Sequence, residues 1–354
     1  MKKKTFTYIA GHTGLVGSAI CRRLAKRSGP ELLTAGSSKL DLCRQAETEK
    51  FFKAHKIDRV YLAAAKVGGI LANSTYKAEF IYDNLAIAMN VVHAAYKTGV
   101  KKLLNLGSSC IYPKLAHQPM TEASLLTSAL EPTNEAYAVA KIAALKLCRY
   151  YNEQYGTNYL SAMPTNIYGP HDNFNLETAH VLPAMMRKLH LAKLMRAGDF
   201  SAIAADVKKY PLGFGLDAKV GTGDRKKIAA ALRGLGITAG NVSLWGTGEV
   251  YREFLYVDDL ADACVFLMEK CDYKDIGEII NVGTGKDIKL KDLAQEIKEV
   301  VGFEGGIVYD SSKPDGTPRK LLDTSRIEAL GWKPRVQLRE GIARSYAFYN
   351  NGSL

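Results

Sequence analysis

The sequence contains no apolar run long enough to cross a membrane as a helix, so we expect no membrane-spanning segment. Its six cysteines lie far apart and form no C-x-x-C pair, which argues against a zinc site and against a disulfide framework. Apolar residues make up 47% and charged residues 24% of the 354 residues, a balance that excludes a disordered or collagen-like chain. A glycine-rich turn, and no cleavage site, follows the basic, apolar start. We therefore expect a cytoplasmic protein with reduced thiols and no bound metal.

Charge is unbalanced, with a formal net charge of +12 that would attract nucleic acid, a membrane surface or phosphorylated small molecules. The tightest basic clusters, residues 2–4 and 225–227, are not interleaved with aromatic residues that could stack on bases. We therefore expect no nucleic-acid partner and no membrane partner.

Short apolar segments alternate with helical segments through the first half of the chain. Strands are predicted at residues 5–10, 31–35, 58–64, 102–106 and 158–163, and helices at 18–26, 44–55, 84–98 and 136–155. This alternation predicts a Rossmann-like α/β fold, a doubly wound parallel sheet with helices on both faces. Ligands then bind at the carboxyl ends of the strands.

The regular alternation ends after residue 163. We predict a loop at 166–175, and an irregular segment at 198–241 with one helical candidate at 224–235. Further helices are predicted at 180–197, 258–270 with Asp258 or Asp259 as its N-cap, and 289–301, and residues 326–350 close the chain. Residues 1–165 would form the dinucleotide-binding domain. Residues 166–354 would form a smaller, mainly substrate-binding portion with some returning core elements.

A glycine-rich turn follows the first predicted strand and opens a helix, with Gly11, Gly14 and Gly17 three residues apart. Glycines let the backbone turn sharply and approach a pyrophosphate at the helix N-terminus. A tight strand–helix turn without a ligand is the alternative interpretation. The strand before it and the helix after it favour dinucleotide binding.

Two further groups of residues could carry chemistry. Tyr137 and Lys141 share one helix face, where a lysine would lower the tyrosine pKa and suit it to exchange a proton with a carbonyl or alcohol oxygen. Ser108 follows a predicted strand at its carboxyl end, and Cys110 could serve as a base if its pKa is lowered. Each group alone is also explained by an amphipathic helix, a turn or a small buried side chain. Their combination with the glycine turn favours a catalytic site.

Long segments of the chain resemble the extended short-chain dehydrogenases/reductases and, among them, the GDP-L-fucose synthases. They are GHTGLVGSAI at 11–20, VYLAAAKVGGI at 60–70, LGSSCIYPK at 106–114, EPTNEAYAVAKIAALKLC at 131–148, MPTNIYGPHDNFN at 163–175, HVLPAMMRK at 180–188, REFLYVDD at 252–259, INVGTG at 280–285 and SKPDGTPRKLLD at 312–323. The resemblance covers nearly the whole chain apart from about residues 190–240.

The resemblance implies NADPH-dependent 3,5-epimerisation and 4-reduction of GDP-4-keto-6-deoxy-D-mannose to GDP-L-fucose, by a homodimer. Ser108, Tyr137 and Lys141 match the reductase triad. Cys110 matches the epimerisation base, and His180 matches the acid. Histidine suits that role because its pKa lies near neutrality. Positions that hold the GDP-sugar match Lys188, Trp245, Arg252 and Asp315. The NADP-binding set expected on this basis is Gly11, His12, Thr13, Gly14, Leu15, Val16, Gly17, Ser37, Asp41, Leu106, Gly107, Ser108, Ser109, Lys141, Pro164, Thr165, Asn166, Ile167 and His180.

The chain departs from the family pattern at two places. Thr13 and Ser37 stand where the family often has arginines that meet the 2′-phosphate of the cofactor. Residues 34–39 contain no acidic residue, and Ser37, Ser38 and Lys39 could donate to a phosphate, so we expect an NADPH preference weaker than that of an arginine-bearing site. The stretch at 190–240 is about 40 residues longer than expected and carries nine basic and four acidic residues. It could be a lid, an oligomer contact or a neutral insertion, and we hypothesise that it forms a helical, basic cover beside the GDP site.

Two other functions stay open. The first is a related C4-reductase or epimerase for another nucleotide sugar, such as a GDP-heptose; Cys110 and His180 favour epimerisation but do not identify the sugar. The second is a non-catalytic dinucleotide- or RNA-binding member of the fold. Only the net charge supports the second function, and the set of Ser108, Tyr137 and Lys141 argues against it.

Overall fold

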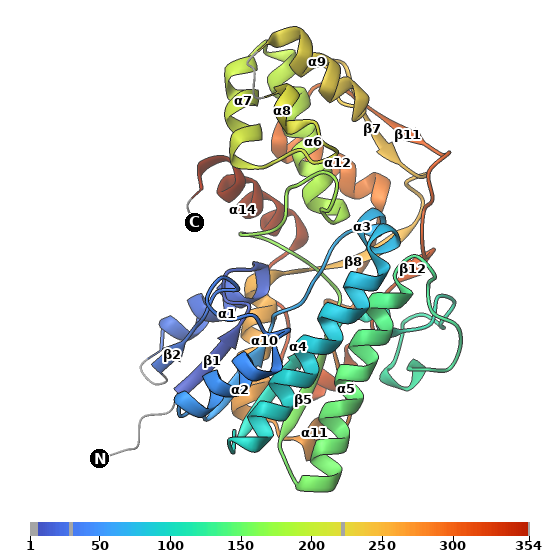
Figure 1. The fold of residues 1–354 in the computed structure, drawn as a ribbon. Helices are drawn as coiled ribbons and strands as arrows, with labels where there is room; N and C mark the ends of the chain where they lie inside the picture. The colour runs from blue at the N-terminus through green and yellow to red at the C-terminus, as the bar shows by residue number, and fades with distance from the viewer. Residues whose placement is uncertain (1–5, 28–30, 221–223, 353–354) are drawn as a thin grey trace.

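The computed structural model describes residues 6–27, 31–220 and 224–352. The basic cluster at 2–4 and the first residue of the strand predicted at 5–10 lie outside the described residues. Figure 1 shows a body built on the blue and green strands, with a second group of helices and strands stacked on one end of it. None of the described helices is both long and apolar enough to span a membrane.

The core of the first body is a six-stranded sheet in which all neighbouring strands run parallel. Its order is β2 (Glu31–Leu33), β1 (Phe6–Ala10), β3 (Arg59–Leu62), β4 (Lys102–Leu106), β5 (Tyr159–Pro164) and β9 (Ile280–Val282). The strand order reverses between β1 and β3, the point at which open sheets of this kind bind ligands. The five predicted strands are confirmed. The sixth, β9, comes from the second half of the chain and was not predicted.

Helices cover both faces of the sheet, which confirms the doubly wound α/β fold. Ile9 of β1 packs in a core with α1 (Leu15–Ala25) and α10 (Val257–Lys270), whereas its neighbours Tyr8 and Ala10 pack in another. The helices on that opposite face are α2 (Gln45–Ala54), α4 (Lys77–Lys97) and α5 (Glu135–Tyr155). Successive side chains of a strand point to opposite faces, so one short apolar segment serves both layers.

Two local predictions were wrong. Tyr256, rather than Asp258 or Asp259, occupies the N-cap of α10. Asp258 instead pairs with Arg22 of α1 at 2.8 Å, and Asp259 accepts hydrogen bonds from the backbone near residue 335, so both carboxylates tie the helix to neighbours. The loop predicted at 166–175 begins as a strand, β6 (Asn166–Tyr168), because it pairs with β8.

The second body is built around two small sheets. Strand β8 (Tyr251–Tyr256) pairs with β6, β10 (Asp287–Lys289) and β12 (Arg319–Lys320), and β7 (Asn241–Trp245) pairs with β11 (Gly306–Asp310). The predicted helices at 180–197 and 289–301 are confirmed as α6 (Val181–Arg196) and α12 (Leu290–Val301).

Further helices of the described chain are short or lie near its end. The final segment forms α13 (Ser325–Ala329) and α14 (Leu338–Asn351). Shorter helices are α3 (Ile70–Thr75), α11 (Tyr273–Ile276), and the 3₁₀ turns η1 (Ser109–Ile111) and η2 (Glu122–Ser124).

The segment at 198–241, which was predicted to be less regular and yet hypothesised to form a helical cover, is largely helical. It forms α7 (Phe200–Lys209), α8 (Asp217–Val220) and α9 (Arg225–Gly234), of which only α9 was predicted. Asp199 caps α7 and Asp224 caps α9 by accepting backbone N–H groups. Ile203, Ile228 and Leu232 are fully buried in the same core as α6, α12 and α14. The segment is therefore part of the core of the second body.

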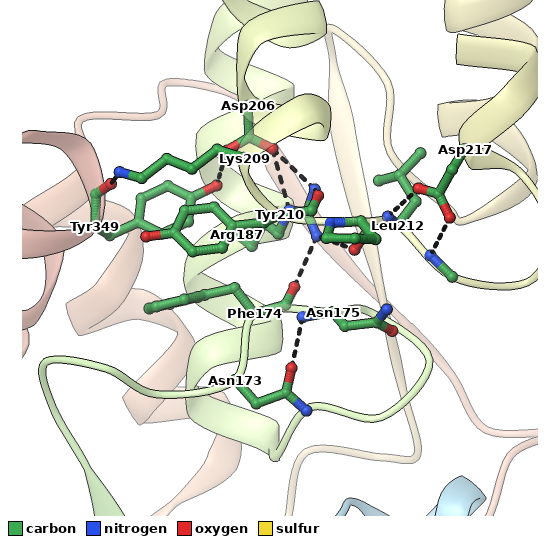
Figure 2. Close-up of polar contacts among 12 residues, drawn as sticks. Asn173, Phe174, Asn175, Arg187, Asp206, Lys209, Tyr210, Leu212, Asp217 and Tyr349 are labelled. Atoms are coloured by element: carbon green, nitrogen blue, oxygen red, sulfur yellow. Dashed lines mark hydrogen bonds and ion pairs between the residues drawn. The ribbon is translucent and has the colours of Figure 1, made fainter. Parts of the chain in front are cut away.

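A buried arginine holds this segment in place (Figure 2). Arg187 of α6 has no exposed surface and donates to the Asp206 carboxylate from Nε at 3.1 Å and from Nη2 at 2.9 Å. It also donates to the carbonyl oxygens of Phe174 at 2.8 Å, Pro211 at 2.7 Å, and Tyr210. The Tyr349 hydroxyl of α14 donates to Asp206. A fully satisfied buried charge of this kind joins α6, α7 and α14 in one arrangement.

Candidate active site

A cavity of about 1980 Å³ lies between the carboxyl ends of the central strands and the second body. Every residue of the predicted site lines it. The lining comes from the turn after β1, the ends of β4 and β5, and helix α5 in the first body. The second body contributes the start of α6, strands β7 and β8, and the segment before β12. A cavity of this size can hold a dinucleotide and a nucleotide sugar together.

The turn after β1 requires glycine at two positions. Gly11 has φ of +82°, and a Cβ there would lie 2.7 Å from the backbone nitrogen of Ala64. A Cβ at Gly17 would collide with the carbonyl oxygen of Gly11. The turn thereby brings the start of α1 to the cavity wall, where the first N–H groups of a helix favour an anion. This arrangement suits the pyrophosphate of a dinucleotide.

Tyr137 and Lys141 lie on one face of α5, and Ser108 follows β4. The ammonium of Lys141 donates to the carbonyl oxygen of Leu106 at 2.9 Å and lies 5.7 Å from the centroid of the Tyr137 ring. The expectation that Lys141 lowers the Tyr137 pKa does not hold in this structure. Burial and the nearby Cys110 raise the Tyr137 pKa, which the hydrogen bond with Ser108 offsets only in part. Tyr137 is thus held as the neutral phenol, the form that can give a proton.

Burial lowers the pKa of Lys141 to about 8. The side chain is only 7% exposed, and a charge so far from water is costly. Its hydrogen bond to the end of β4 fixes it between the central strand and Tyr137.

Cys110 lies in the 3₁₀ turn after Ser108, and its backbone N–H donates to the Ser108 hydroxyl at 3.2 Å. Its thiol lies 3.2 Å from the ammonium of Lys320, a residue that sequence reasoning missed. Burial raises the Cys110 pKa, but the charge of Lys320, hydrogen bonds with Ser108 and Lys320, and the charge of Arg252 outweigh it and leave the pKa below its ordinary value. Lys320 falls in the segment 312–323 that carries the resemblance, which was the only sequence signal for it.

His180 precedes α6 at its N-cap and lines the same cavity. Burial, and secondarily the charge of Lys320, lower its pKa. The chain therefore presents a thiol and an imidazole to one space from segments that are 70 residues apart in the sequence.

Basic and aromatic groups occupy the second-body end of the cavity. Arg252 is only 9% exposed and donates to the carbonyl oxygens of Tyr251 at 2.7 Å and Asp315 at 3.2 Å. The Asp315 carboxylate accepts hydrogen bonds from the Thr247 N–H and hydroxyl, at 2.7 and 2.8 Å.

Lys188 and Trp245 complete this end. Lys188 donates to the carbonyl oxygen of Ser243 at 3.0 Å, and burial lowers its pKa to about 8. Trp245 is 47% exposed, with the ammonium of Lys313 5.7 Å from the centroid of its ring. Cations beside an exposed aromatic ring suit a nucleoside diphosphate.

The opposite end of the cavity follows β2. Ser37, Asp41 and Thr13 line it, whereas Ser38 and Lys39, which were expected to help bind a phosphate, are not among its lining residues. Asp41 accepts a hydrogen bond from the Cys43 N–H at 2.9 Å, so its carboxylate is partly engaged within the turn.

The model of the NAD dependent epimerase/dehydratase family matches residues 7–204 and 209–283. The chain belongs to this family, and it is therefore an enzyme that uses a nicotinamide cofactor. It is 48% identical to GDP-L-fucose synthase 1 of Arabidopsis thaliana over 98% of this chain and 94% of that protein.

Two solved structures extend the comparison. A GDP-6-OMe-4-keto-L-xylo-heptose reductase from C. jejuni has a TM-score of 0.92 and 37% identity, over 100% of this chain and 99% of that one. A GDP-L-fucose synthetase from Naegleria fowleri, solved bound to NADP, has a TM-score of 0.79 and 26% identity, over 99% of this chain and 96% of that one.

Proposed function

We propose that this chain converts GDP-4-keto-6-deoxy-D-mannose to GDP-L-fucose by 3,5-epimerisation and NADPH-dependent 4-reduction. The observation that carries the proposal is one cavity lined by two chemical sets. Ser108, Tyr137 and Lys141 suit reduction, and Cys110 with His180 suits epimerisation. The 48% identity to a plant GDP-L-fucose synthase over nearly the full length supports this substrate.

Epimerisation needs a base and an acid at the sugar ring. The C4 ketone acidifies the protons at C3 and C5, and Cys110, as the thiolate, accepts one of them. His180, as the imidazolium, returns a proton to the other face of the same carbon. After each inversion the thiol loses its proton to solvent and the imidazole regains one, so that the pair is ready for the second carbon.

Reduction at C4 uses a different set of groups. The nicotinamide cofactor supplies the hydride for this step. Ser108 donates a hydrogen bond to the C4 oxygen, and Tyr137 gives that oxygen its phenolic proton. Burial keeps Tyr137 as the neutral phenol, which is the form that carries the proton that the alkoxide needs.

NADPH is the proposed cofactor. Residues 34–39 after β2 lack the acidic residue that binds the ribose hydroxyls in NAD-specific sites, and the Ser37 hydroxyl lines the cavity there. The NADP bound to the Naegleria fowleri structure supports the same choice.

A homodimer through α4 and α5 is part of the proposal. These helices pack against each other, and together they expose Tyr82, Met89 and Tyr150, at 67%, 56% and 54%. Apolar groups at such exposure on a helix pair favour burial against a second copy. Sedimentation measurements on the wild type and on Met89→Glu test it, and a monomeric wild type would refute it.

The activity is tested directly by incubation with GDP-4-keto-6-deoxy-D-mannose and NADPH. Absorbance at the reduced nicotinamide band should fall, and proton NMR should show a product inverted at C3 and C5. A C4-reductase for a GDP-heptose is the second candidate, favoured by the TM-score of 0.92 to the heptose reductase. Faster turnover of a GDP-4-keto-heptose, with no C3 or C5 inversion, would establish that candidate instead.

A further inference from the structure

Lys320 ends the short strand β12 and lies at the wall of the cavity, partly exposed. Its ammonium is 3.2 Å from the Cys110 sulfur, across 210 positions of sequence. Among the described residues, no carboxylate forms an ion pair with it. By contrast, the preceding Arg319 pairs with Asp287, at 2.5 Å, and does not line the cavity. The charge of Lys320 is therefore directed at the thiol.

The backbone around Lys320 is fixed on both sides. Lys320 pairs in register with Arg252 of β8. The next two residues donate backbone hydrogen bonds to the Gln118 side chain at 2.8 Å and to the buried Glu253 carboxylate at 2.9 Å. These backbone contacts fix the position of the Lys320 main chain, and from that position its ammonium reaches the Cys110 sulfur at 3.2 Å.

Cys110 differs from the other five cysteines of the chain. Cys148, Cys264 and Cys271 are buried, and burial raises the pKa of each. Burial also raises the pKa of Cys43, to about 11, and that of Cys21. Cys110 alone has a lowered pKa, and the charge of Lys320 is the largest of the effects that lower it.

We propose that Lys320 is a positioning residue that holds Cys110 as a thiolate ready to remove the C3 and C5 protons, an inference that rests on the proposed function. The thiolate lone pair takes the proton, and the C–H electron pair passes into the enolate at C4. The sulfur then becomes a neutral thiol, and the ammonium of Lys320 keeps its own proton throughout. Because the same charge faces His180, it also makes the imidazolium a stronger acid.

The test is the pH dependence of Cys110 alkylation by iodoacetamide, located by mass spectrometry of the Cys110 peptide. It requires no substrate, so it is separate from the proposed activity. Replacing Lys320→Met should raise the apparent pKa of alkylation by about one unit or more, which slows labelling about tenfold at pH values below that pKa. Lys320→Arg should restore most of the labelling rate, because it keeps the charge.

Arg319→Gln is the matched control, since it removes one positive charge from the same strand and keeps a donor for Asp287. It should label at the wild-type rate. An unchanged alkylation pKa in Lys320→Met would overturn the proposal, even if KM for the GDP-sugar rose, because that result would make Lys320 a substrate-binding group. If Lys320→Met does not fold, the same measurement is made on wild type, Lys320→Arg and Lys320→Gln. Equal apparent pKa values of Cys110 alkylation in all three would refute the proposed role of Lys320.

A second measurement separates this inference from the proposed function. Solvent-deuterium exchange at C3 and C5 of the keto-sugar should slow in Lys320→Met in proportion to the lost thiolate. A wild type that shows the Lys320-dependent alkylation but no exchange would refute the function and leave the ion pair intact. Exchange at the wild-type rate in Lys320→Met would overturn the inference and leave the function intact.

Discussion

The two halves of the candidate active site, which we name reductase half and epimerase half after their proposed steps, are assembled in different ways. The reductase half takes Ser108 from the end of β4, and Tyr137 and Lys141 from one face of α5, so all three belong to the central sheet and its covering helix. The epimerase half draws Cys110, His180 and Lys320 from segments that meet only because the second body folds onto the first.

This difference shows how each half controls proton transfer. In the reductase half, burial is the largest effect on both groups, raising the Tyr137 pKa and lowering that of Lys141 to about 8. In the epimerase half, the charge of Lys320 acts against burial and lowers the Cys110 pKa. One cavity can therefore hold a phenol with a raised pKa and a thiol with a lowered pKa.

The sharpest separation of the halves is expected from Tyr137→Phe. Loss of the proton donor should slow C4 reduction on the order of 10³-fold, while exchange of the C3 and C5 protons with deuterated water continues. Proton NMR follows both processes in one sample. Reduction at a near-normal rate would show that another group gives the proton.

Arg187→Met tests whether the second body depends on its buried ion pair. It leaves the buried Asp206 carboxylate without its charged partner and, among the described side chains, with only the Tyr349 hydroxyl, which should lower the free energy of unfolding by about 3–5 kcal/mol. Arg196→Met is the control, because its ion pair with Glu304 is solvent-exposed and should contribute little. Chemical denaturation measures both. Equal stability of the two variants would contradict the anchoring role assigned to Arg187.

Cys110→Ser should reverse the effect of Tyr137→Phe. Exchange of the C3 and C5 protons should fall on the order of 10²-fold or more, the usual contribution of a general base. Direct C4 reduction of the uninverted sugar should then be detectable. If both protons exchange at the wild-type rate, Cys110 is only a packed thiol.

Helix α9, in the segment at 190–240, offers a smaller test of binding at the second-body end of the cavity. Excising the segment would expose the core that it shares with α6, so a point variant is the better probe. Lys227 lines the cavity and the adjacent Lys226 does not. Lys227→Ala should raise KM for the GDP-sugar roughly three- to fivefold with KM for NADPH unchanged. Lys226→Ala should leave both constants as they are; an equal effect in the two variants would assign the segment no role in binding.

The smallest effect is expected at the ribose end of the cofactor site. With Ser37 and without an arginine or an acid at residues 34–39, kcat/KM should favour NADPH over NADH by roughly tenfold. Ser37→Ala should reduce that preference. A clear preference for NADH in the wild type would show that Asp41 dominates the selection.

The division of the chain near residue 165, with some core elements returning from the second half, stays a prediction. Strand β9 pairs with β5, and α10 packs on α1, so the second half of the chain completes the first body. Separate expression of residues 1–165 would leave apolar surface of β5 and α1 uncovered, and we expect it not to fold alone.

Local features of the sequence determined most of the strands and helices of the first body and several residues of its part of the site. Alternating apolar segments, the glycine turn and the four-residue spacing of Tyr137 and Lys141 depend on residues close together in the chain, where period and spacing carry the information. Ser108 and Cys110 were predictable in the same way, because they follow a short apolar segment at its carboxyl end. The resemblance to a known family, rather than any local pattern, assigned His180, Lys188, Arg252 and Asp315.

Only the tertiary structure decided the long-range contacts of the candidate site and of the second body. Lys320 approaches Cys110 because β12 pairs with β8, and nothing in the residues around position 320 specifies that pairing. In the sequence, nothing distinguishes Arg187 and Asp206 from other charged residues. They form a stabilising ion pair because they are buried together among α6, α7 and α14. The direction of each pKa shift likewise depends on burial and on neighbours distant in sequence, because electrostatic interactions follow separation in space and local dielectric rather than position along the chain.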